Sequence, residues 1–493
     1  MVKRRRIAIV GGGITGLAAA HRVATLAPDV EVALFEASDR VGGILQTDRR
    51  DGYLIEHSAD SLVTNVPWGL ELCRELGIAD TLLPTEPSRR KAMVVFEGKL
   101  VPVPTGFQLL TPSPAEALMA SPLLSDAGKQ RVLAETSVKL RSPSLGVVLG
   151  SADDDESLES FAVRRLGREC YDRIVQPLVG GIFTADPAKL SMRAALPRFL
   201  DLEAKFGSLT AARGRAKDDE EGTSPAGGAL SATSGSETQD KSSGARYGLF
   251  VAPRDGMQAI IDALVATLPA GIIRLSAPLE RIEHASSTGI WKLAVRGAAK
   301  VEEFDGLIMA VRAPVAARLL GSVDAELAAG LGKIPYAGST IALSGYRLDR
   351  IANPLDCFGF VVPDVERREI LAASFSSRKY PGRAPEGYVL IRTFLGGALR
   401  PDMVDLGGAE VRAIVGRELG ELIGARGEPE LFEIRRWHGA MPQYHLGHAA
   451  LVERLEQRAA NYAGLALAGN ALRGVGVPQC IRTGRDAADR LLA

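Results

Sequence analysis

The chain has 493 residues, of which 46% are hydrophobic, and this length allows two or three domains with sizeable buried cores. Its 59 basic and 59 acidic side chains cancel, which removes any global electrostatic argument for binding nucleic acid or an anionic membrane. The four cysteines are scattered without a metal-ligand or disulfide pattern, so we expect no metal site and a reducing, cytoplasmic setting. No uncharged apolar run approaches the roughly 20 residues of a transmembrane helix, and the basic N-terminus is interpreted as a polar lead into the first strand.

The first forty residues carry the pattern of a dinucleotide-binding fold. A buried parallel strand is predicted over residues 7–10, followed by a helix over 17–26 and a second strand over 31–35. Glu36 ends this strand, twenty residues after the last motif glycine, where an acid takes the ribose hydroxyls of an adenosine. The G-x-G-x-x-G spacing allows a tight turn and close approach of a pyrophosphate to the helix N-terminus. The candidate residues of this loop are Gly11, Gly12, Gly13, Ile14, Thr15 and Gly16.

The segment after Glu36 favours FAD over NAD. Ala37 is followed by an Arg-x-Gly-Gly sequence, which resembles the superfamily of flavin amine oxidases, phytoene desaturases and protoporphyrinogen oxidases. In that superfamily the arginine and glycines lie along the FAD, so the resemblance implies FAD as cofactor and assigns Arg40, Gly42 and Gly43 to its site. Arginine is a permanent cation with planar donors, and paired glycines let backbone pass close to a flat ring.

A hairpin is predicted over residues 44–64, with its turn at Asp51-Gly52. The resemblance places the residues that follow its second strand beside the flavin, namely Ser58, Ala59, Asp60 and Ser61. The bacterial protoporphyrinogen oxidase-like proteins usually carry Gly-Pro where this chain has Ser58-Ala59, so the backbone of this turn departs from the family pattern. His57 is open to two interpretations, a proton carrier or a structural histidine.

Two further segments suggest contacts with a substrate. Arg89, Arg90 and Lys91 form a basic cluster, which is interpreted as a solvated edge or as a clamp for substrate carboxylates. Residues 106–200 are predicted to be mainly helical, and within them 176–184 and 190–193 resemble the protoporphyrinogen and coproporphyrinogen oxidases of haem synthesis. There this stretch helps to form the substrate cavity, so Gly181 is expected to let a macrocycle approach, and Phe183 to offer a ring face or to pack in the core.

The remaining chain returns to the cofactor. Strands are predicted at 272–275, 279–282, 291–295, 307–311, 340–343 and 465–470, with a helix through 411–422 and another ending at 492. In the superfamily the C-terminal segment lies against the isoalloxazine, so Val475, Gly476 and Val477 join the predicted FAD site. By the same resemblance Leu279 touches the adenine end and Trp437 belongs to the cofactor side.

These patterns predict an α/β protein with a Rossmann-type FAD-binding domain, a mixed α+β substrate domain and a helical subdomain. We assign 1–88, 247–315 and 431–493 to the first, 89–105, 196–212 and 316–430 to the second, and 106–195 to the third. Residues 213–246 are rich in small polar residues and are predicted to be a disordered insertion. The apolar residues between Phe107 and Leu124 indicate a membrane-docking surface or interior helix packing.

The resemblance implies oxidation of a porphyrinogen to a porphyrin by FAD, with dioxygen as final acceptor and hydrogen peroxide released. Coproporphyrinogen III is favoured as substrate over protoporphyrinogen IX. A flavin amine oxidase, a carotenoid desaturase and a non-catalytic tetrapyrrole carrier are the alternatives. No residue is assigned as a catalytic base. The expected partners are the porphyrinogen, dioxygen, a ferrochelatase that receives the product, and the inner face of a membrane as a peripheral contact; nucleic acid is not expected.

Overall fold

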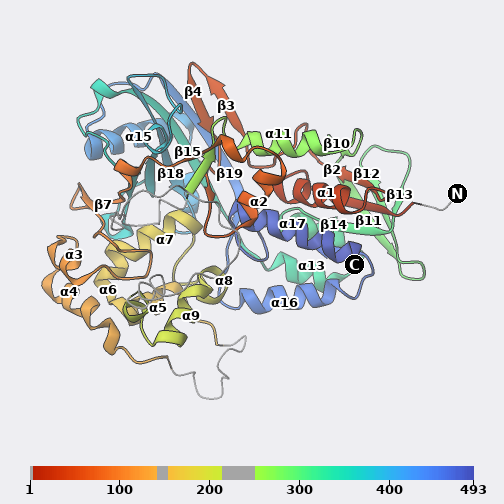
Figure 1. The fold of residues 1–493 in the computed structure, drawn as a ribbon, viewed down its shortest axis with the longest axis horizontal. Helices are drawn as coiled ribbons and strands as arrows, with labels where there is room; N and C mark the ends of the chain where they lie inside the picture. Colours follow the sequence, from red (N-terminus) through yellow and green to blue (C-terminus); the bar gives the residue numbers. More distant parts are fainter. Residues whose placement is uncertain (1–3, 142–153, 214–249) are drawn as a thin grey trace.

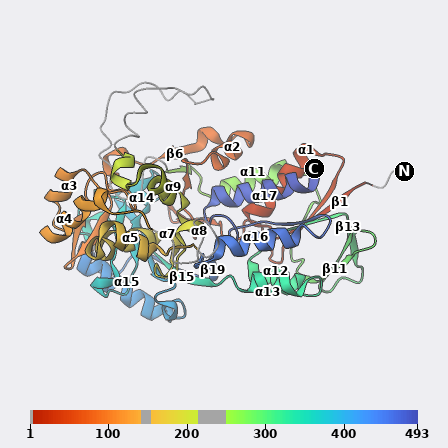
Figure 2. The same ribbon diagram turned by 90° about the horizontal axis from the view of Figure 1, so that it is seen from below.

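The computed structural model describes residues 4–141, 154–213 and 250–493, and the predicted insertion at 213–246 therefore lies almost entirely outside the described residues. Figure 1 shows an elongated molecule, with a small parallel sheet and its helices at one end and a large sheet with a helical region at the other. Figure 2 shows the same division from below. No helix in the described ranges is long and apolar enough to cross a membrane.

A five-stranded parallel sheet forms the dinucleotide-binding part, in the order β10-β2-β1-β14-β20. Its strands are β1 (Arg6–Val10), β2 (Glu31–Phe35), β10 (Ile273–Arg274), β14 (Gly306–Met309) and β20 (Leu465–Leu467). Five segments that are far apart in the sequence thus meet in one sheet, and the strands predicted at 7–10, 31–35, 272–275, 307–311 and 465–470 are confirmed.

Alternate residues of β1 enter two separate cores, because successive side chains of a strand point to opposite faces. Ile7 and Ile9 pack with α1 (Ile14–Leu26), α2 (Trp68–Glu75), α11 (Gln258–Thr267) and α17 (Val477–Leu492). Ala8 and Val10 face the other core. That core is completed by the sheet of β11 (Leu279–Ala285), β12 (Ile290–Val295) and β13 (Glu302–Phe304), and by α12 (Ala313–Leu320), α13 (Ala325–Gly332) and α16 (His448–Ala459).

The seven-stranded sheet has the order β19-β15-β18-β17-β16-β7-β8 and is mainly antiparallel. Its strands are β7 (Met93–Phe96), β8 (Lys99–Pro102), β15 (Tyr336–Arg347), β16 (Gly359–Val361), β17 (Ala372–Phe375), β18 (Tyr388–Gly396) and β19 (Leu431–Pro442). The helix α15 (Gly408–Ile423) covers one face through a core that includes Val411, Val415 and Leu419. β19 belongs to this sheet although the sequence division at 431 assigned it to the FAD-binding domain; that division stays a prediction.

The helical region packs against the large sheet at β7, whose Val94 belongs to the core of this region. It consists of α3 (Ala115–Ala120), α4 (Asp126–Leu133), α5 (Leu158–Leu166), α6 (Arg168–Cys170), the π-helix Tyr171–Val175, α7 (Gln176–Phe183), α8 (Met192–Ala195) and α9 (Pro197–Phe206). The apolar segment between Phe107 and Leu124 is largely interior, because Phe107, Leu110, Leu118, Leu123 and Leu124 are buried. Met119 is exposed, but the burial of these five residues supports the interior interpretation over a docking surface.

Shorter elements connect these parts. The predicted hairpin is confirmed as β3 (Thr47–Arg50) paired with β4 (Tyr53–Glu56), and its turn residues Asp51 and Gly52 have φ of 51° and 79°. A small sheet joins β5 (Leu62–Val63), β6 (Leu82–Pro84) and β9 (Phe250–Pro253), and α14 (Ser376–Lys379) follows β17. All four cysteines are buried as free thiols.

Candidate flavin and substrate site

In the glycine segment after β1, an added β-carbon would have room at one glycine and would collide with backbone at two others. Gly11 has a φ of +107°, and a β-carbon there would collide with the carbonyl oxygen of Ala310. A β-carbon on Gly16 would collide with the carbonyl oxygen of Gly11, so this glycine permits close packing of helix on loop. Gly13 is the N-cap of α1, and a β-carbon there would meet nothing within 4 Å. The open space therefore lies at the helix N-terminus, where a pyrophosphate fits.

The acid at the end of β2 organises this loop. Glu36 accepts hydrogen bonds from the backbone N–H of Gly12 at 2.7 Å and of Ser38 at 2.8 Å. Each carboxylate oxygen can accept more than one hydrogen bond, so the side chain keeps capacity for a ribose hydroxyl. Ile14 and Thr15 are buried in the first turn of α1, whereas Ala37 is exposed beside the loop.

The Arg-x-Gly-Gly segment folds back against the glycine loop. Arg40 donates to the carbonyl oxygens of Val41 at 3.1 Å, Leu45 at 3.3 Å and Gly43 at 2.6 Å. Gly42 pairs with Gly13 in an isolated parallel bridge, and both Gly42 and Gly43 have positive φ. The guanidinium thus fixes the shape of the loop, and the glycines keep its backbone close to the open space at Gly13.

His57 is a structural histidine in this arrangement. Its imidazole is fully buried; Nδ1 accepts from Nε of Arg435 at 2.8 Å, so Nε2 carries the proton and donates to Asp48 at 2.6 Å. Burial lowers the pKa of His57, which favours the neutral ring. The indole Nε1 of Trp437 donates to the His57 carbonyl oxygen at 2.7 Å. The large sheet therefore holds the segment that leads into Ser58 and Ala59.

The C-terminal candidates surround the start of α17. Gly476 is the N-cap of this helix, and its neighbours Val475 and Val477 are half-buried. The hydroxyl of Tyr444 accepts from Gly474 N–H at 2.9 Å and donates to the carbonyl oxygen of Asn470, which fixes the loop that precedes the helix. Leu279 lies elsewhere, buried at the start of β11 in the core behind the parallel sheet.

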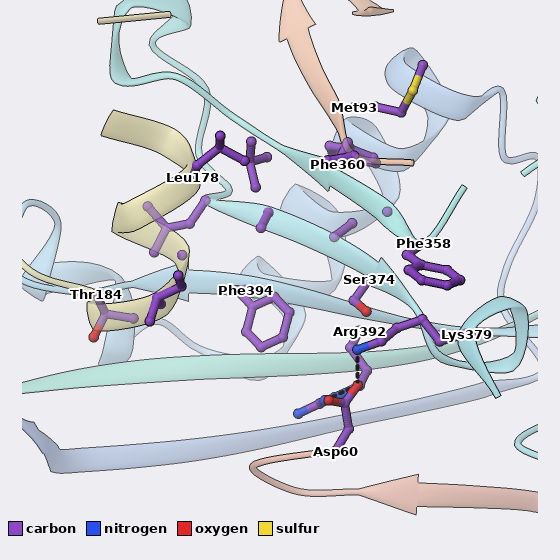
Figure 3. Close-up of a pocket in the computed structure, with 18 of the residues that line it drawn as sticks. Asp60, Met93, Leu178, Thr184, Phe358, Phe360, Ser374, Lys379, Arg392 and Phe394 are labelled. Atoms are coloured by element: carbon purple, nitrogen blue, oxygen red, sulfur yellow. Dashed lines mark hydrogen bonds and ion pairs between the residues drawn. The ribbon is translucent and has the colours of Figure 1, made fainter. Parts of the chain in front are cut away.

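A cavity of about 250 Å³ lies between α7 and the large sheet. Figure 3 shows Leu178 and Thr184 on the α7 side, and Phe360 and Phe394 on the strands opposite. The walls are mainly apolar, and the cavity is bordered by backbone at Gly181 and Gly359. The arrangement suits a flat or puckered hydrophobic ring system, because apolar walls with few polar groups are typical of sites for such molecules.

One charged cluster interrupts these apolar walls. Asp60 forms ion pairs with Lys379 Nζ at 2.9 Å and Arg392 Nη1 at 3.1 Å, and Arg392 also donates to the carbonyl oxygen of Ser58. The two cations hold the pKa of the Asp60 carboxyl well below its usual range in spite of its burial. Ser61 donates its hydroxyl to Asp60 at 2.9 Å. Asp60 thus stays ionised at neutral pH.

Lys379 and Arg392 were missed by sequence reasoning. Lys379 ends the short helix α14 and carries no motif. Arg392 did leave a signal, since it is the one charged residue in the apolar sequence of β18 (Tyr388–Gly396). A charge in a buried strand requires a partner, and that partner, Asp60, comes from a segment more than 300 residues away.

The predicted substrate residues are placed unevenly around the cavity. Gly181 lines it, whereas Phe183 is buried in the helical core and its neighbour Ile182 lines the wall instead. Arg89, Arg90 and Lys91 immediately precede Ala92, which is part of the wall. Arg90 donates to Thr85, and Lys91 pairs with Asp356 at 3.2 Å. A role of this cluster in substrate binding stays a prediction.

The loop at Gly13, the acid at Glu36 and the helix start at Gly476 define a dinucleotide-binding oxidoreductase of the α/β class, with a separate apolar cavity. The chain belongs to the flavin-containing amine oxidoreductase family, whose model matches residues 14–492. FAD is therefore its cofactor, and the open space at Gly13 and the free helix N-terminus fit the pyrophosphate of that group.

Individual relatives cover almost the whole chain. It is 33% identical to a coproporphyrinogen III oxidase of Propionibacterium freudenreichii subsp. freudenreichii, over 99% of this chain and 90% of the relative. It is 28% identical to the coproporphyrinogen III oxidase of Bacillus subtilis (strain 168), over 98% of this chain and 97% of the relative. Among solved structures, the "Putative protoporphyrinogen oxidase from Exiguobacterium sp. 255-15" superposes with a TM-score of 0.83 at 26% identity, covering 100% of this chain and 99% of that one.

Proposed function

We propose that this protein oxidises coproporphyrinogen III to coproporphyrin III in haem biosynthesis, with dioxygen as the final acceptor and hydrogen peroxide as the second product. The observation that carries the proposal is the cavity between α7 and the large sheet, which has mainly apolar walls and two cationic side chains. A tetrapyrrole with carboxylate substituents combines the same two properties, an apolar ring system and anionic groups. The similarity over nearly the full chain to coproporphyrinogen III oxidases supports this substrate.

The side chains bind and orient, and the cofactor carries the electron transfer. FAD, when bound, supplies the acceptor for hydride from the macrocycle and the centre at which dioxygen is reduced. The glycine loop and Glu36 hold the cofactor, and the apolar walls exclude water from the substrate. Asp60 is ionised but engaged by two cations, so it is a poor proton acceptor. We therefore assign no catalytic base among the described cavity residues, and the pyrrole protons pass to water or within the substrate.

An oxidase assay under air with both porphyrinogens, read by porphyrin fluorescence, tests the proposal. We expect turnover of coproporphyrinogen III with stoichiometric peroxide, and slower turnover of protoporphyrinogen IX. A preference for protoporphyrinogen IX would select the second candidate, which the structural similarity to the Exiguobacterium protein favours. A yellow, FAD-loaded protein that binds both compounds and oxidises neither would instead be a tetrapyrrole carrier.

Two interactions complete the proposal. Coproporphyrin III released from the cavity passes to a ferrochelatase, the class of enzyme that inserts iron into such a ring. The protein acts in the cytoplasm with peripheral contact to the inner face of the membrane, for which the exposed Met119 and Leu140 of the helical region are the available apolar side chains. Sedimentation with anionic vesicles tests this contact, and an unchanged supernatant fraction would remove it.

A further inference from the structure

The charged side chains that line the cavity do not balance one another. Among the lining residues, Lys379 and Arg392 are cations and Asp60 is the anion, so the cavity wall carries one uncompensated positive charge. Lys379 and Arg392 are both largely removed from solvent, with side-chain exposures of 12% and 3%. A buried charge without a partner is costly, which points to an anion that belongs in this cavity.

Glu56, whose carboxyl interacts electrostatically with Arg392, does not remove this imbalance of charge. Glu56 is buried and accepts hydrogen bonds from Thr47 at 2.8 Å and from the Met257 N–H at 2.8 Å. Burial raises the pKa of Glu56 to about 7, so this carboxyl is only partly ionised at neutral pH. A second cation, Arg383, also acts on Glu56. Glu56 therefore supplies less than one full negative charge to be shared by two arginines.

Arg392 also retains a free donor. Its Nη1 pairs with Asp60 and its Nη2 donates to the Ser58 carbonyl oxygen, but its Nε has no hydrogen-bond partner among the described residues. Lys379 has three donor positions, and its ion pair with Asp60 uses one of them. Buried polar groups are normally hydrogen-bonded, so this unpaired donor, on a guanidinium of 3% exposure, is available to an acceptor in the cavity.

We propose that Lys379 and Arg392 form a carboxylate subsite inside the cavity, which binds one propionate of the tetrapyrrole while Asp60 holds the two cations in position. The subsite rests on the proposed function for the identity of the carboxylate. Figure 3 shows Lys379 and Arg392 converging on Asp60 at one end of the cavity, with Phe394 and Phe358 beside them. The propionate would thus be anchored at this end while the ring lies along the apolar walls.

Binding of product to the FAD-loaded enzyme tests the subsite without turnover. The probes are coproporphyrin III and its tetramethyl ester, which keeps the ring and lacks the charges, and the readout is porphyrin fluorescence on titration with protein. Lys379→Met should weaken binding of coproporphyrin III by about tenfold or more, as expected for loss of a charge-assisted hydrogen bond, and leave the ester unchanged. Lys379→Arg, which keeps the charge, should restore most of the affinity.

Two further variants make the comparison decisive. Arg392→Gln should give the same selective loss from the other side of the pair. Lys292→Met is the matched control, because Lys292 forms an exposed pair with Glu303 at 3.7 Å in the three-stranded sheet, and it should change neither affinity. Equal weakening of acid and ester by Lys379→Met, or no weakening of either, would overturn the subsite.

The wild-type protein gives an independent reading if the variants lose FAD. It should bind coproporphyrin III at least tenfold more tightly than the ester, and equal affinities would also overturn the subsite. The failure of the subsite and the failure of the proposed function can be told apart. A wild type that binds the acid selectively through Lys379 but oxidises neither porphyrinogen refutes the activity and supports the subsite. Turnover without selectivity for the acid supports the activity and refutes the subsite.

Discussion

Gly13 and Gly16 lie three residues apart at the start of α1, yet alanine at these positions should have different consequences. A β-carbon on Gly13 meets nothing within 4 Å, and its backbone, with φ −71° and ψ 176°, is accessible to any residue. In the absence of cofactor, Gly13→Ala makes the unfolded chain less flexible, which stabilises the fold slightly, and gives α1 a slightly poorer N-cap, which destabilises it. The net change in the free energy of unfolding is therefore within about 1 kcal/mol. With FAD, the new methyl group occupies the space of the pyrophosphate.

Gly16→Ala places its β-carbon against the carbonyl oxygen of Gly11, which is backbone and cannot rotate away. Overpacking of this kind costs about 1–3 kcal/mol or more whether FAD is present or not. The two variants thus separate cofactor binding from folding.

The assay is thermal unfolding of apo-protein, with and without FAD, beside titration of flavin fluorescence. At FAD concentrations about 100-fold above Kd, the wild type should gain roughly 2.7 kcal/mol from ligand binding. Gly13→Ala should unfold like wild-type apo-protein and lose that gain, whereas Gly16→Ala should unfold early in both conditions. A Gly13→Ala protein that binds FAD with wild-type affinity would refute the placement of the pyrophosphate.

Three further outcomes are expected. Neutralising the 89–91 cluster should lower kcat/KM for coproporphyrinogen III more than for protoporphyrinogen IX, since the former carries propionates in place of two vinyl groups; equal losses in paired assays would reduce the cluster to a solvated edge. Burial lowers the pKa of His448 to about 4, below the unfolded value near 6.5, so stability is complete above pH 6.5 and falls by up to roughly 3 kcal/mol as pH drops towards 4. His448→Gln should flatten this dependence in urea unfolding at pH 7 and 5, and an unaltered slope would assign it to other groups. Tyr444→Phe removes the partner of two partly buried backbone groups, at Asn470 and Gly474, so it should cost about 1–3 kcal/mol and weaken FAD retention; unchanged melting and flavin content would contradict this.

Local patterns were sufficient for the first β-α-β unit of the parallel sheet and for the glycine loop. The strand before Gly11 and the acid at Glu36 lie within forty residues of one another, and their geometry is set by a short β-α-β unit. The hairpin turn at Asp51-Gly52 was also predictable, because these residues tolerate positive φ.

The cavity could be anticipated only on its α7 side, where Gly181 lies in a segment with a family resemblance. The opposite wall is made by strands whose register depends on long-range pairing, such as β18 with β15. Lys379 reaches Asp60 only once this sheet is assembled, so no spacing along the chain connects them. Phe183 shows that a correctly predicted segment does not fix which of its side chains faces the cavity. Phe183 packs in the core, whereas its neighbour Ile182 lines the cavity.

The four buried cysteines have a consequence for the durability of the protein. Under the proposed function hydrogen peroxide is the second product, and peroxide attacks thiolates far faster than thiols. Burial raises the pKa of Cys73, Cys357 and Cys480 to about 11 and shifts that of Cys170 in the same direction, so hardly any thiolate forms at neutral pH. The four thiols of the folded chain are thus unreactive towards peroxide, and their oxidation should begin only as the protein unfolds.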